Sequence, residues 1–393
     1  MRRPMDRHAA WPALAATATV LATACTLHTD LLRQPPPERW NPALNTHPDS
    51  PAFQALLDRY VREGLPGVVL LVRTPQGQWN GASGYASIEA SERMLPTHLH
   101  HVASVTKMYL ATAVMLLVQD GVLDLDARVS RYLPEPLLSQ IPNGAEVTVR
   151  HLVGHTSGIP DFGQVQAYDL DFMNDPLGSY PAERLLGYLR GQSAKFAPGT
   201  GWFYSNVNYV LLALIVDRVA GTSHARVISE RILRPRGLGA TFYKTGAGYP
   251  TPPGLVSSYT ETAGRLFNVS DQAVHAADVF IGNAGLIASS ADLAAFVEAL
   301  LGGRLVGPEA LAEMTRGNRY FSGYGLGLSI WNTRYGAAIG HDGGSTGTLC
   351  TVRHFPDSHA TLVLLVNSGQ GTATREAFLR LWRDAVQTAL GRP

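Results

Sequence analysis

Residues 103–109 read A-S-V-T-K-M-Y, and the spacing of Ser104 and Lys107 in this stretch decides how the whole sequence is interpreted. Residues three apart in a helix share a face, so the lysine amine can approach the serine hydroxyl. A serine hydroxyl is a poor nucleophile unless a base lies nearby. The alternative is a helix-capping serine followed by a surface lysine. The apolar run M-Y-L-A-T-A-V-M-L-L-V after Lys107 favours the first interpretation, because it indicates a turn that enters the core.

Two further polar stretches carry groups that suit a buried lysine and a substrate. A lysine near a core needs a partner or a shifted pKa. At 204–206 the chain reads Y-S-N, where Tyr204 offers a phenol and Asn206 an amide that can hold both the lysine and a substrate carbonyl. At 341–344 it reads H-D-G-G between two predicted strands, and glycines there allow a substrate to lie against the strand edge.

These three stretches carry a family resemblance. The motifs S-x-x-K, Y-x-N and H-x-G stand in the order found in the serine β-lactamase and D,D-peptidase superfamily. The chain resembles its class C-like branch, which also contains D,D-carboxypeptidases, D-aminopeptidases and carboxylesterases. The flanking stretches L-V-G-H-T-S-G-I at 152–159 and P-G-T-G-W-F-Y-S-N-V-N-Y-V-L-L at 198–212 are similar as well. The similarity runs from about residue 53 to the C-terminus.

The resemblance implies acyl transfer through a covalent acyl-enzyme, followed by attack of water. Ser104 is then the nucleophile, and Lys107 and Tyr204 share the proton transfers, with the identity of the base left open. The backbone N–H groups of Ser104 and Gly344 would form the oxyanion hole. The implied substrate-binding and oxyanion residues are Asn206, His341, Asp342, Gly343 and Gly344. The substrate is a small molecule or a peptide, with cell-wall peptide as one candidate.

The third motif departs from the family pattern in two residues. The middle residue is usually Thr or another small residue, but here it is Asp342, which would repel a substrate carboxylate if it faces the cleft ionised. The usual Lys is replaced by His341, which is only partly charged near neutral pH. Both changes favour an ester, or a peptide whose carboxylate is not needed for binding, unless Asp342 points away and an Arg elsewhere supplies charge. The alternatives are a class C-type β-lactamase and a penicillin-binding sensor that acylates without turnover.

Strand patterns lie at both ends of the chain and helical patterns lie between them. This order predicts an α/β (α+β) fold, an antiparallel sheet flanked by helices with an inserted mainly helical domain. The predicted domain covers 52–393, with the sheet from about 65–100 and 280–393 and the helical insertion at about 104–280. A cleft at their interface is the expected position of a site. Helices are predicted over 53–63, 104–120, 148–154, 181–190, 206–220, 223–233, 290–301 and 373–390, and strands over 67–73, 78–86, 324–331, 337–341, 348–355 and 360–367.

The N-terminus has the pattern of an export signal. Three arginines within residues 2–7 precede an apolar run that ends A-T-A-C, which predicts a signal peptide over 1–24. Cleavage after Ala24 would release a soluble protein, whereas lipidation of Cys25 would anchor it to a bacterial membrane. A Pro-rich linker is predicted over 25–51. We therefore expect an exported protein, periplasmic or secreted, with a lipid anchor as the open alternative.

Composition limits the other classes of function. The formal net charge of +1 argues against a nucleic-acid binder. The two cysteines, Cys25 and Cys350, cannot form a disulfide framework, and no zinc-binding spacing is present. No cofactor and no metal are expected, since His98, His100 and His101 lack a nearby carboxylate or Cys. His98 and His100 would share one face of a strand.

Two further motifs compete with the assigned site. The K-T-G at 244–246 runs into a Pro-rich loop, where the third motif of the family does not belong. The G-G-S-T-G at 343–347 matches the nucleophile elbow of α/β-hydrolases, which needs a following helix, whereas strands are predicted here. Neither is expected to be catalytic. His155 is expected to be structural and Cys350 a buried small hydrophobic residue.

Overall fold

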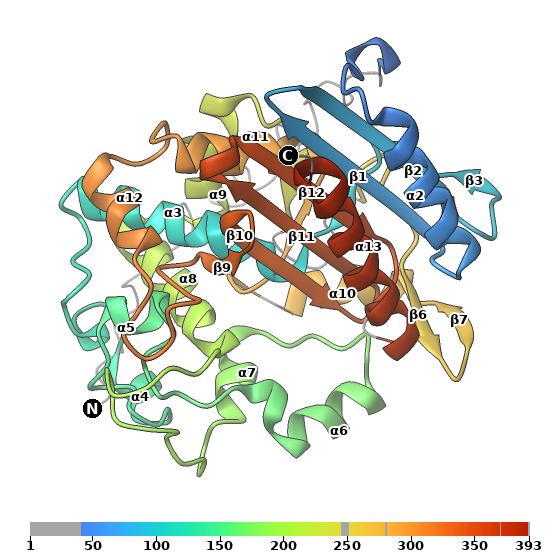
Figure 1. Cartoon of the computed structure of the whole chain (residues 1–393). Coiled ribbons are helices and arrows are strands. Elements are labelled where there is room, and N and C mark those ends of the chain that lie inside the picture. The colour runs from blue at the N-terminus through green and yellow to red at the C-terminus, as the bar shows by residue number, and fades with distance from the viewer. Residues whose placement is uncertain (1–40, 245–250, 280, 370, 392–393) are drawn as a thin grey trace, which may run out of the picture. The chain divides into compact units, whose positions relative to one another are not determined.

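The computed structural model describes residues 41–244, 251–279, 281–369 and 371–391 (Figure 1). The predicted signal peptide, Cys25 and the linker up to residue 40 lie outside the described residues. The main sheet has seven strands in the order β3-β2-β1-β12-β11-β10-β9, and every neighbouring pair is antiparallel. Its strands are β1 (Gly67–Thr74), β2 (Gly77–Ser87), β3 (Glu92–Arg93), β9 (Ser329–Thr333), β10 (Gly336–Ser345), β11 (Thr348–Phe355) and β12 (Ala360–Val366). The predicted antiparallel sheet flanked by helices is confirmed.

The centre of the sheet joins the two ends of the described chain. Strand β1 pairs with β12, with Val68 opposite Val366. Both strands are almost continuously apolar and buried, as expected for strands that are covered on both faces. Successive side chains point to opposite faces, so Val69 and Leu71 enter one core and Val68 and Leu70 the other.

Helices cover both faces of the sheet. Helices α2 and α13 pack together on one face (Figure 1), and α11 packs on β1, β11 and β12 from the other. The helices are α2 (Ser50–Arg62), α3 (Thr106–Gln119), α4 (Glu135–Leu138), α5 (Val149–Val153), α6 (Gln166–Asn174), α7 (Ala182–Gly187), α8 (Asn206–Ala220), α9 (His224–Ile228), α10 (Ser270–Val279), α11 (Ser290–Leu301), α12 (Pro308–Thr315) and α13 (Thr372–Leu390). None of the helices in the described part of the chain is long and apolar enough to span a membrane.

Short strands in the middle of the chain were not predicted, apart from a strand around residues 98–100. A three-stranded sheet has the order β4-β8-β5, and β6 pairs with β7 as a hairpin. These strands are β4 (His100–His101), β5 (Thr241–Tyr243), β6 (Tyr259–Thr262), β7 (Arg265–Asn268) and β8 (Leu286–Ala288). At two to four residues each, they are too short to leave a periodic pattern in the sequence.

Two local predictions were wrong, and a third, a helix, was right in extent but not in its regular geometry. The strand predicted over 324–331 begins only at Ser329, because the positive φ of Gly327 turns the chain just before it. The helix predicted over 223–233 gives way after Ile228 to a π-helical turn. His98 precedes β4 instead of sharing a strand face with His100, and its Nε2 lies 3.3 Å from the carboxylate of Glu92, a neighbour that the sequence interpretation had overlooked.

Candidate active site

A strained turn presents Ser104 at the start of α3. Residues Ala103–Val105 form a 3-10 turn that leads into the helix, and Ala103 has a φ of 43°. Few residues other than glycine adopt this left-handed conformation, and such strain concentrates at functional sites. The start of the turn is fixed to strand β8, since the N–H of Val102 donates to the carbonyl of Leu286 at 3.1 Å.

Lys107 is fully buried directly beneath Ser104. Its Nζ lies 2.9 Å from Ser104 Oγ, 2.9 Å from Asn206 Oδ1 and 2.9 Å from the carbonyl oxygen of Asn283. The amide and carbonyl oxygens can only accept, so they take two protons of the amine. The remaining position of the nitrogen faces the serine. A protonated amine donates to the hydroxyl there, whereas a neutral amine directs its lone pair at the hydroxyl proton.

Burial sets the protonation of this lysine. Desolvation lowers the pKa of Lys107 to about 7, against the opposing effect of the Asp161 carboxylate. Asp161 is itself buried and accepts hydrogen bonds from the N–H groups of Asn206 and Gly163. It therefore caps the N-terminus of α8, a role the sequence interpretation missed. The local cap candidate, Ser205, instead donates its hydroxyl to the carbonyl of Pro160 at 3.1 Å.

Tyr204 lies beside the same lysine and is supported by His155. Its ring centre is 4.9 Å from Lys107 Nζ and 4.3 Å from the imidazole ring of His155. Desolvation raises the pKa of the Tyr204 phenol, against the opposing effect of its hydrogen bond with Ser104. His155 accepts a hydrogen bond from the N–H of Ser205 at Nδ1. This agrees with the structural role expected for His155.

The third motif lies on the free part of strand β10. Strand β9 pairs with β10 only as far as Gly340, so the residues after it form an open edge. The buried His341 donates from Nδ1 to the carbonyl of Asp342 at 2.6 Å, which leaves Nε2 to accept from the Tyr324 hydroxyl at 3.0 Å. Desolvation lowers the pKa of His341 to about 4. The imidazole is therefore neutral near pH 7, which corrects the prediction of partial charge.

Gly343 is required by the close approach of the Ser104 turn to β10. A Cβ at this position would lie 2.2 Å from the carbonyl oxygen of Val102 and 2.6 Å from Cys350 Sγ. The Cys350 thiol donates to the same Val102 carbonyl at 3.3 Å and is buried, as predicted. This packing places the backbone of Gly344, the predicted oxyanion donor, beside Ser104, and both residues line the same two cavities.

Asp342 is held by an arginine from the neighbouring strand. Its carboxylate contacts the Arg353 guanidinium at 2.5 Å and accepts from Thr351 Oγ1 at 2.6 Å. The Arg353 side chain is fully buried and stacks on Trp331, with 3.8 Å from its central carbon to the ring centre. Asp342 nevertheless keeps 42% of its side chain exposed, so it faces the cleft as a compensated charge.

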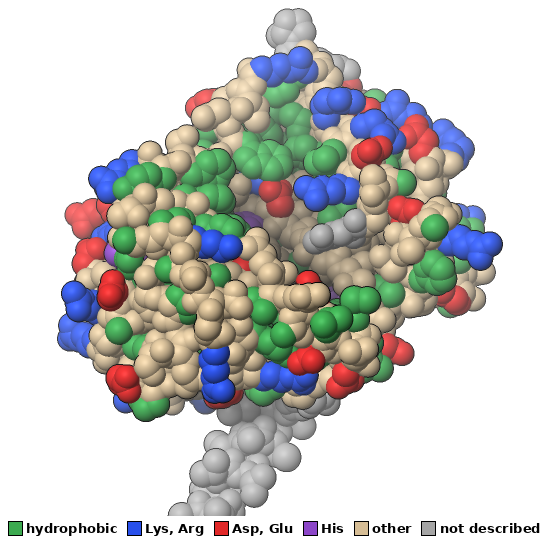
Figure 2. Space-filling view, turned by 90° about the horizontal axis from the view of Figure 1, so that it is seen from below, with side chains coloured by type: hydrophobic (Ala, Val, Ile, Leu, Met, Phe, Trp, Pro, Cys, Tyr) green, Lys and Arg blue, Asp and Glu red, His purple; other side chains and the backbone are tan. Residues whose placement is uncertain are grey.

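Two cavities meet at Ser104. The first, the acidic cavity, has a volume of about 550 Å³, and its charged lining residues are Asp169 of α6 and Glu261 of β6. The second, the aromatic cavity, has a volume of about 400 Å³. Its aromatic lining residues are Trp202, Tyr204, Phe321, Tyr324, Trp331 and Phe378. Figure 2 shows a hollowed face of the molecule with hydrophobic side chains along the rim of the hollow.

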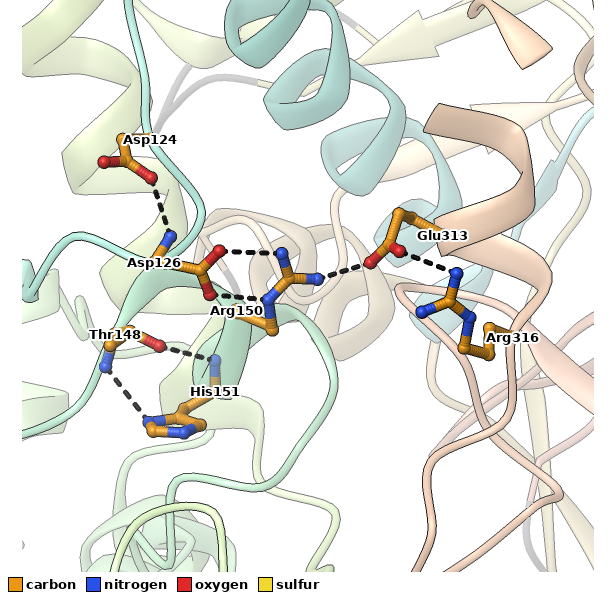
Figure 3. Close-up of polar contacts among 7 residues, drawn as sticks. All are labelled: Asp124, Asp126, Thr148, Arg150, His151, Glu313 and Arg316. Carbon is orange, nitrogen blue, oxygen red and sulfur yellow. Dashed lines mark hydrogen bonds and ion pairs between the residues drawn. The ribbon is translucent and has the colours of Figure 1, made fainter. Parts of the chain in front are cut away.

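An ion-pair network supports the segment behind the site (Figure 3). Arg150 of α5 binds the Asp126 carboxylate through two hydrogen bonds and contacts Glu313 of α12 at 2.5 Å. Thr148 caps α5 reciprocally with His151. The helix leads directly into the loop that carries His155 and Asp161, so the network fixes the position from which that loop starts.

The competing motifs lie away from this chemistry. Lys244 is buried, donates to the carbonyl of Val274 at 2.5 Å and lines neither cavity. Residues 343–345 end strand β10, and residues 346–347 form the turn into β11, so no helix follows Ser345, as predicted. The described residues contain no group of three or more His, Cys, Asp or Glu residues that could hold a metal ion.

Comparisons with known proteins agree on one family. A sequence model described as Beta-lactamase matches residues 53–387. Esterase EstB of Burkholderia gladioli is 30% identical over 320 residues, which cover 75% of this chain and 81% of that protein. Penicillin-binding protein 4* of Bacillus subtilis (strain 168) is 27% identical over 337 residues, 80% of this chain and 70% of that protein. The solved structure of D-amino acid amidase from Ochrobactrum anthropi SV3 complexed with L-phenylalanine is 26% identical in sequence. The match covers 86% of this chain and 99% of the amidase chain, with a TM-score of 0.73.

Proposed function

Because this chain belongs to the β-lactamase family and is a serine hydrolase, we propose that it forms an acyl-enzyme on Ser104 and cleaves an ester bond or a D-amino-acid peptide or amide bond. The observation that carries the proposal is the buried amine of Lys107, which lies 2.9 Å from Ser104 Oγ and has a pKa of about 7. A base with a pKa near the working pH combines a neutral population with useful basicity.

The geometry supports a division of the proton transfers. Lys107 in its neutral form takes the hydroxyl proton as Ser104 Oγ bonds to the carbonyl carbon. The N–H groups of Ser104 and Gly344 stabilise the resulting oxyanion. The phenol of Tyr204 stays protonated near neutral pH because its pKa is raised, so it suits proton donation to the leaving group, with resupply from Lys107. The bond to the leaving group then breaks, and water attacks the ester on Ser104 by the reverse proton path.

The third motif favours substrates without a required carboxylate. His341 is neutral, and the buried charge of Arg353 is compensated by Asp342. The motif itself therefore presents no net positive charge to the anionic group of a β-lactam. This arrangement ranks the esterase or D-amidase activity above the class C-type β-lactamase.

Three assays distinguish these activities. They are labelling with a fluorescent penicillin, hydrolysis of a short-chain p-nitrophenyl ester, and hydrolysis of the amides of D- and L-alanine. We expect ester or D-selective amide hydrolysis that is lost in Ser104→Ala, and slow or weak labelling. Rapid labelling followed by rapid loss of the label would support the β-lactamase instead. A label that persists without hydrolysis of any substrate would support a penicillin-binding sensor, and the absence of every Ser104-dependent reaction would overturn the proposal.

We also propose that the protein is exported, as the charged, apolar and small residues of 1–25 suggest. Expression in a Gram-negative host with radiolabelled palmitate distinguishes the two forms. Label that is lost in Cys25→Ala would support the lipid anchor, whereas unlabelled protein in the periplasm would support cleavage after Ala24. Protein that stays in the cytoplasm at full length would contradict export.

A further inference from the structure

The two cavities that meet at Ser104 differ in the groups that can donate a proton. Tyr204 lines the aromatic cavity but not the acidic cavity, and the Lys107 side chain lines neither. A general acid must lie within hydrogen-bond reach of the atom that it protonates. The leaving group therefore departs into the aromatic cavity, and the acyl portion of the substrate occupies the acidic cavity.

The walls of the aromatic cavity are aromatic rings from distant segments of the chain. The ring centres of Trp202 and Phe321 are 4.3 Å apart, and those of Trp202 and Tyr324 are 5.9 Å apart. Trp331 is fixed from beneath by the stacked guanidinium of Arg353. Phe321 is 44% exposed at the mouth. Aromatic surface that is exposed in a concave site gains when an apolar group covers it.

The charged groups that line the aromatic cavity do not require a charged ligand. The Asp342 carboxylate is compensated by Arg353 and Thr351, and the remaining charged lining residue, Arg375 of α13, is exposed to solvent, where its charge is screened. The acidic cavity contrasts with it, because its charged lining residues are the two carboxylates of Asp169 and Glu261. Two aromatic residues, Tyr168 and Phe172, also line the acidic cavity, so the two cavities differ in the number of aromatic lining residues, six against two, and in the uncompensated carboxylates of the acidic cavity.

We infer that the aromatic cavity is a leaving-group subsite for an apolar ring, so that the preferred substrates are esters or amides of aryl-bearing alcohols or amines. The inference rests on the proposed function, because it assumes acylation of Ser104. It assigns substrate selectivity to residues that touch only the group that leaves, with Phe321 and Trp202 in contact with the ring of that group.

Two pairs of esters test the inference with the native protein. Benzyl and allyl acetate share an acyl group and have leaving alcohols of similar acidity, whereas methyl phenylacetate and methyl 3-butenoate place the same ring or vinyl group on the acyl side. We expect kcat/KM for benzyl acetate to exceed that for allyl acetate by about tenfold or more. The ratio for the acyl-side pair should stay below about threefold, since only two aromatic rings, Tyr168 and Phe172, line the acidic cavity, against six in the aromatic cavity.

A matched pair of variants locates the effect. Phe321→Ala should lower the benzyl-to-allyl ratio by at least about threefold. Phe267→Ala removes a phenylalanine of similar exposure, 49%, that lines neither cavity, and should leave the ratio unchanged. A ratio near one, a ring preference on the acyl side, or an equal effect of both variants, with Ser104-dependent hydrolysis intact, would overturn the inference alone. Absence of Ser104-dependent hydrolysis for all four esters would overturn the inference, and absence of Ser104-dependent hydrolysis of the alanine amides as well would overturn the proposed function with it.

Discussion

Asp342 and Arg353 form an ion pair across two neighbouring strands, with the guanidinium fully buried and the carboxylate 42% exposed. The register of β10 and β11 explains the contact, because Asp342 lies opposite Thr351 and Arg353 follows two residues later on the same face. The pair neutralises the position where the third motif would meet a substrate carboxylate. Removing the carboxylate while keeping the guanidinium would expose a positive charge at this point.

Asp342→Asn should therefore speed acylation by penicillins. The uncompensated guanidinium of Arg353 would attract the carboxylate of the ligand, and we expect a gain of about tenfold in the second-order rate of labelling. Asp357→Asn, at an exposed turn residue of the same sheet, is the matched control and should not change the rate. An unchanged or lower rate in Asp342→Asn would mean that the pair does not set the preference against carboxylates.

The acid limb of the pH profile should follow Lys107. Because Lys107 must be neutral to act as the base, kcat/KM of the native enzyme should rise through a midpoint near pH 7. The Asp161 carboxylate favours the charged amine, so Asp161→Asn should lower the pKa of Lys107 and move the limb to lower pH. The new amide oxygen can still accept from the N–H of Asn206.

The control for this prediction is Asp169→Asn, an exposed acid of the acidic cavity. Stopped assays of one ester across pH 5–9 give the acid limb of kcat/KM for the native enzyme, for Asp161→Asn and for Asp169→Asn. A limb that stays in place in Asp161→Asn, or moves to higher pH, would contradict the role of Lys107 as the titrating base.

His100 should make the fold sensitive to acid. Its ring is fully buried, neither nitrogen has a hydrogen-bond partner, and burial lowers its pKa to about 3. The unfolded chain binds a proton below about pH 6.5 while the folded chain does not, so stability falls as the pH drops from there towards 3. At pH 4.5 this one group costs roughly 2–3 kcal/mol relative to pH 7.

Urea unfolding of the native protein and of His100→Leu at pH 7 and pH 4.5 measures this cost. The variant should lose less stability between the two pH values than the native protein does. His101 and His341, with pKa values lowered to about 4, will keep part of the acid sensitivity in both proteins. Equal losses in the two proteins would show that His100 does not contribute.

The Arg150 network should contribute to stability and not to chemistry. Arg150→Met breaks its contacts with Asp126 and Glu313, and because these groups are partly exposed we expect a loss of about 1 kcal/mol, smaller in high salt. Arg316→Met removes one contact of a more exposed arginine with Glu313 and should cost less. Thermal unfolding at low and high salt gives both values. A cost for Arg150→Met that is independent of salt would mean that lost packing, and not charge, dominates.

The sequence predicted those parts of the site that depend on local spacing. Local spacing places Ser104 beside Lys107 and Tyr204 near Asn206. That these two pairs meet, across 99 residues, was expected only from the family resemblance. Asp161 and Arg353 were missed because their partners lie 45 and 11 residues away and depend on loop path and strand register. The arginine within T-L-C-T-V-R-H-F was a visible signal, since a charged residue in a buried strand needs a partner.

The close approach of Gly343 to the Val102 carbonyl packs the Ser104 turn directly against strand β10. The predicted nucleophile Ser104 and the predicted oxyanion donor Gly344 thus belong to a single mechanical unit. The walls of the cavities do not belong to this unit. Tyr168 lies on helix α6, and Trp202 and Phe321 lie on two separate connecting segments. Evolution can therefore exchange the substrates of this scaffold by altering those segments while the hydrolytic reaction itself is inherited unchanged.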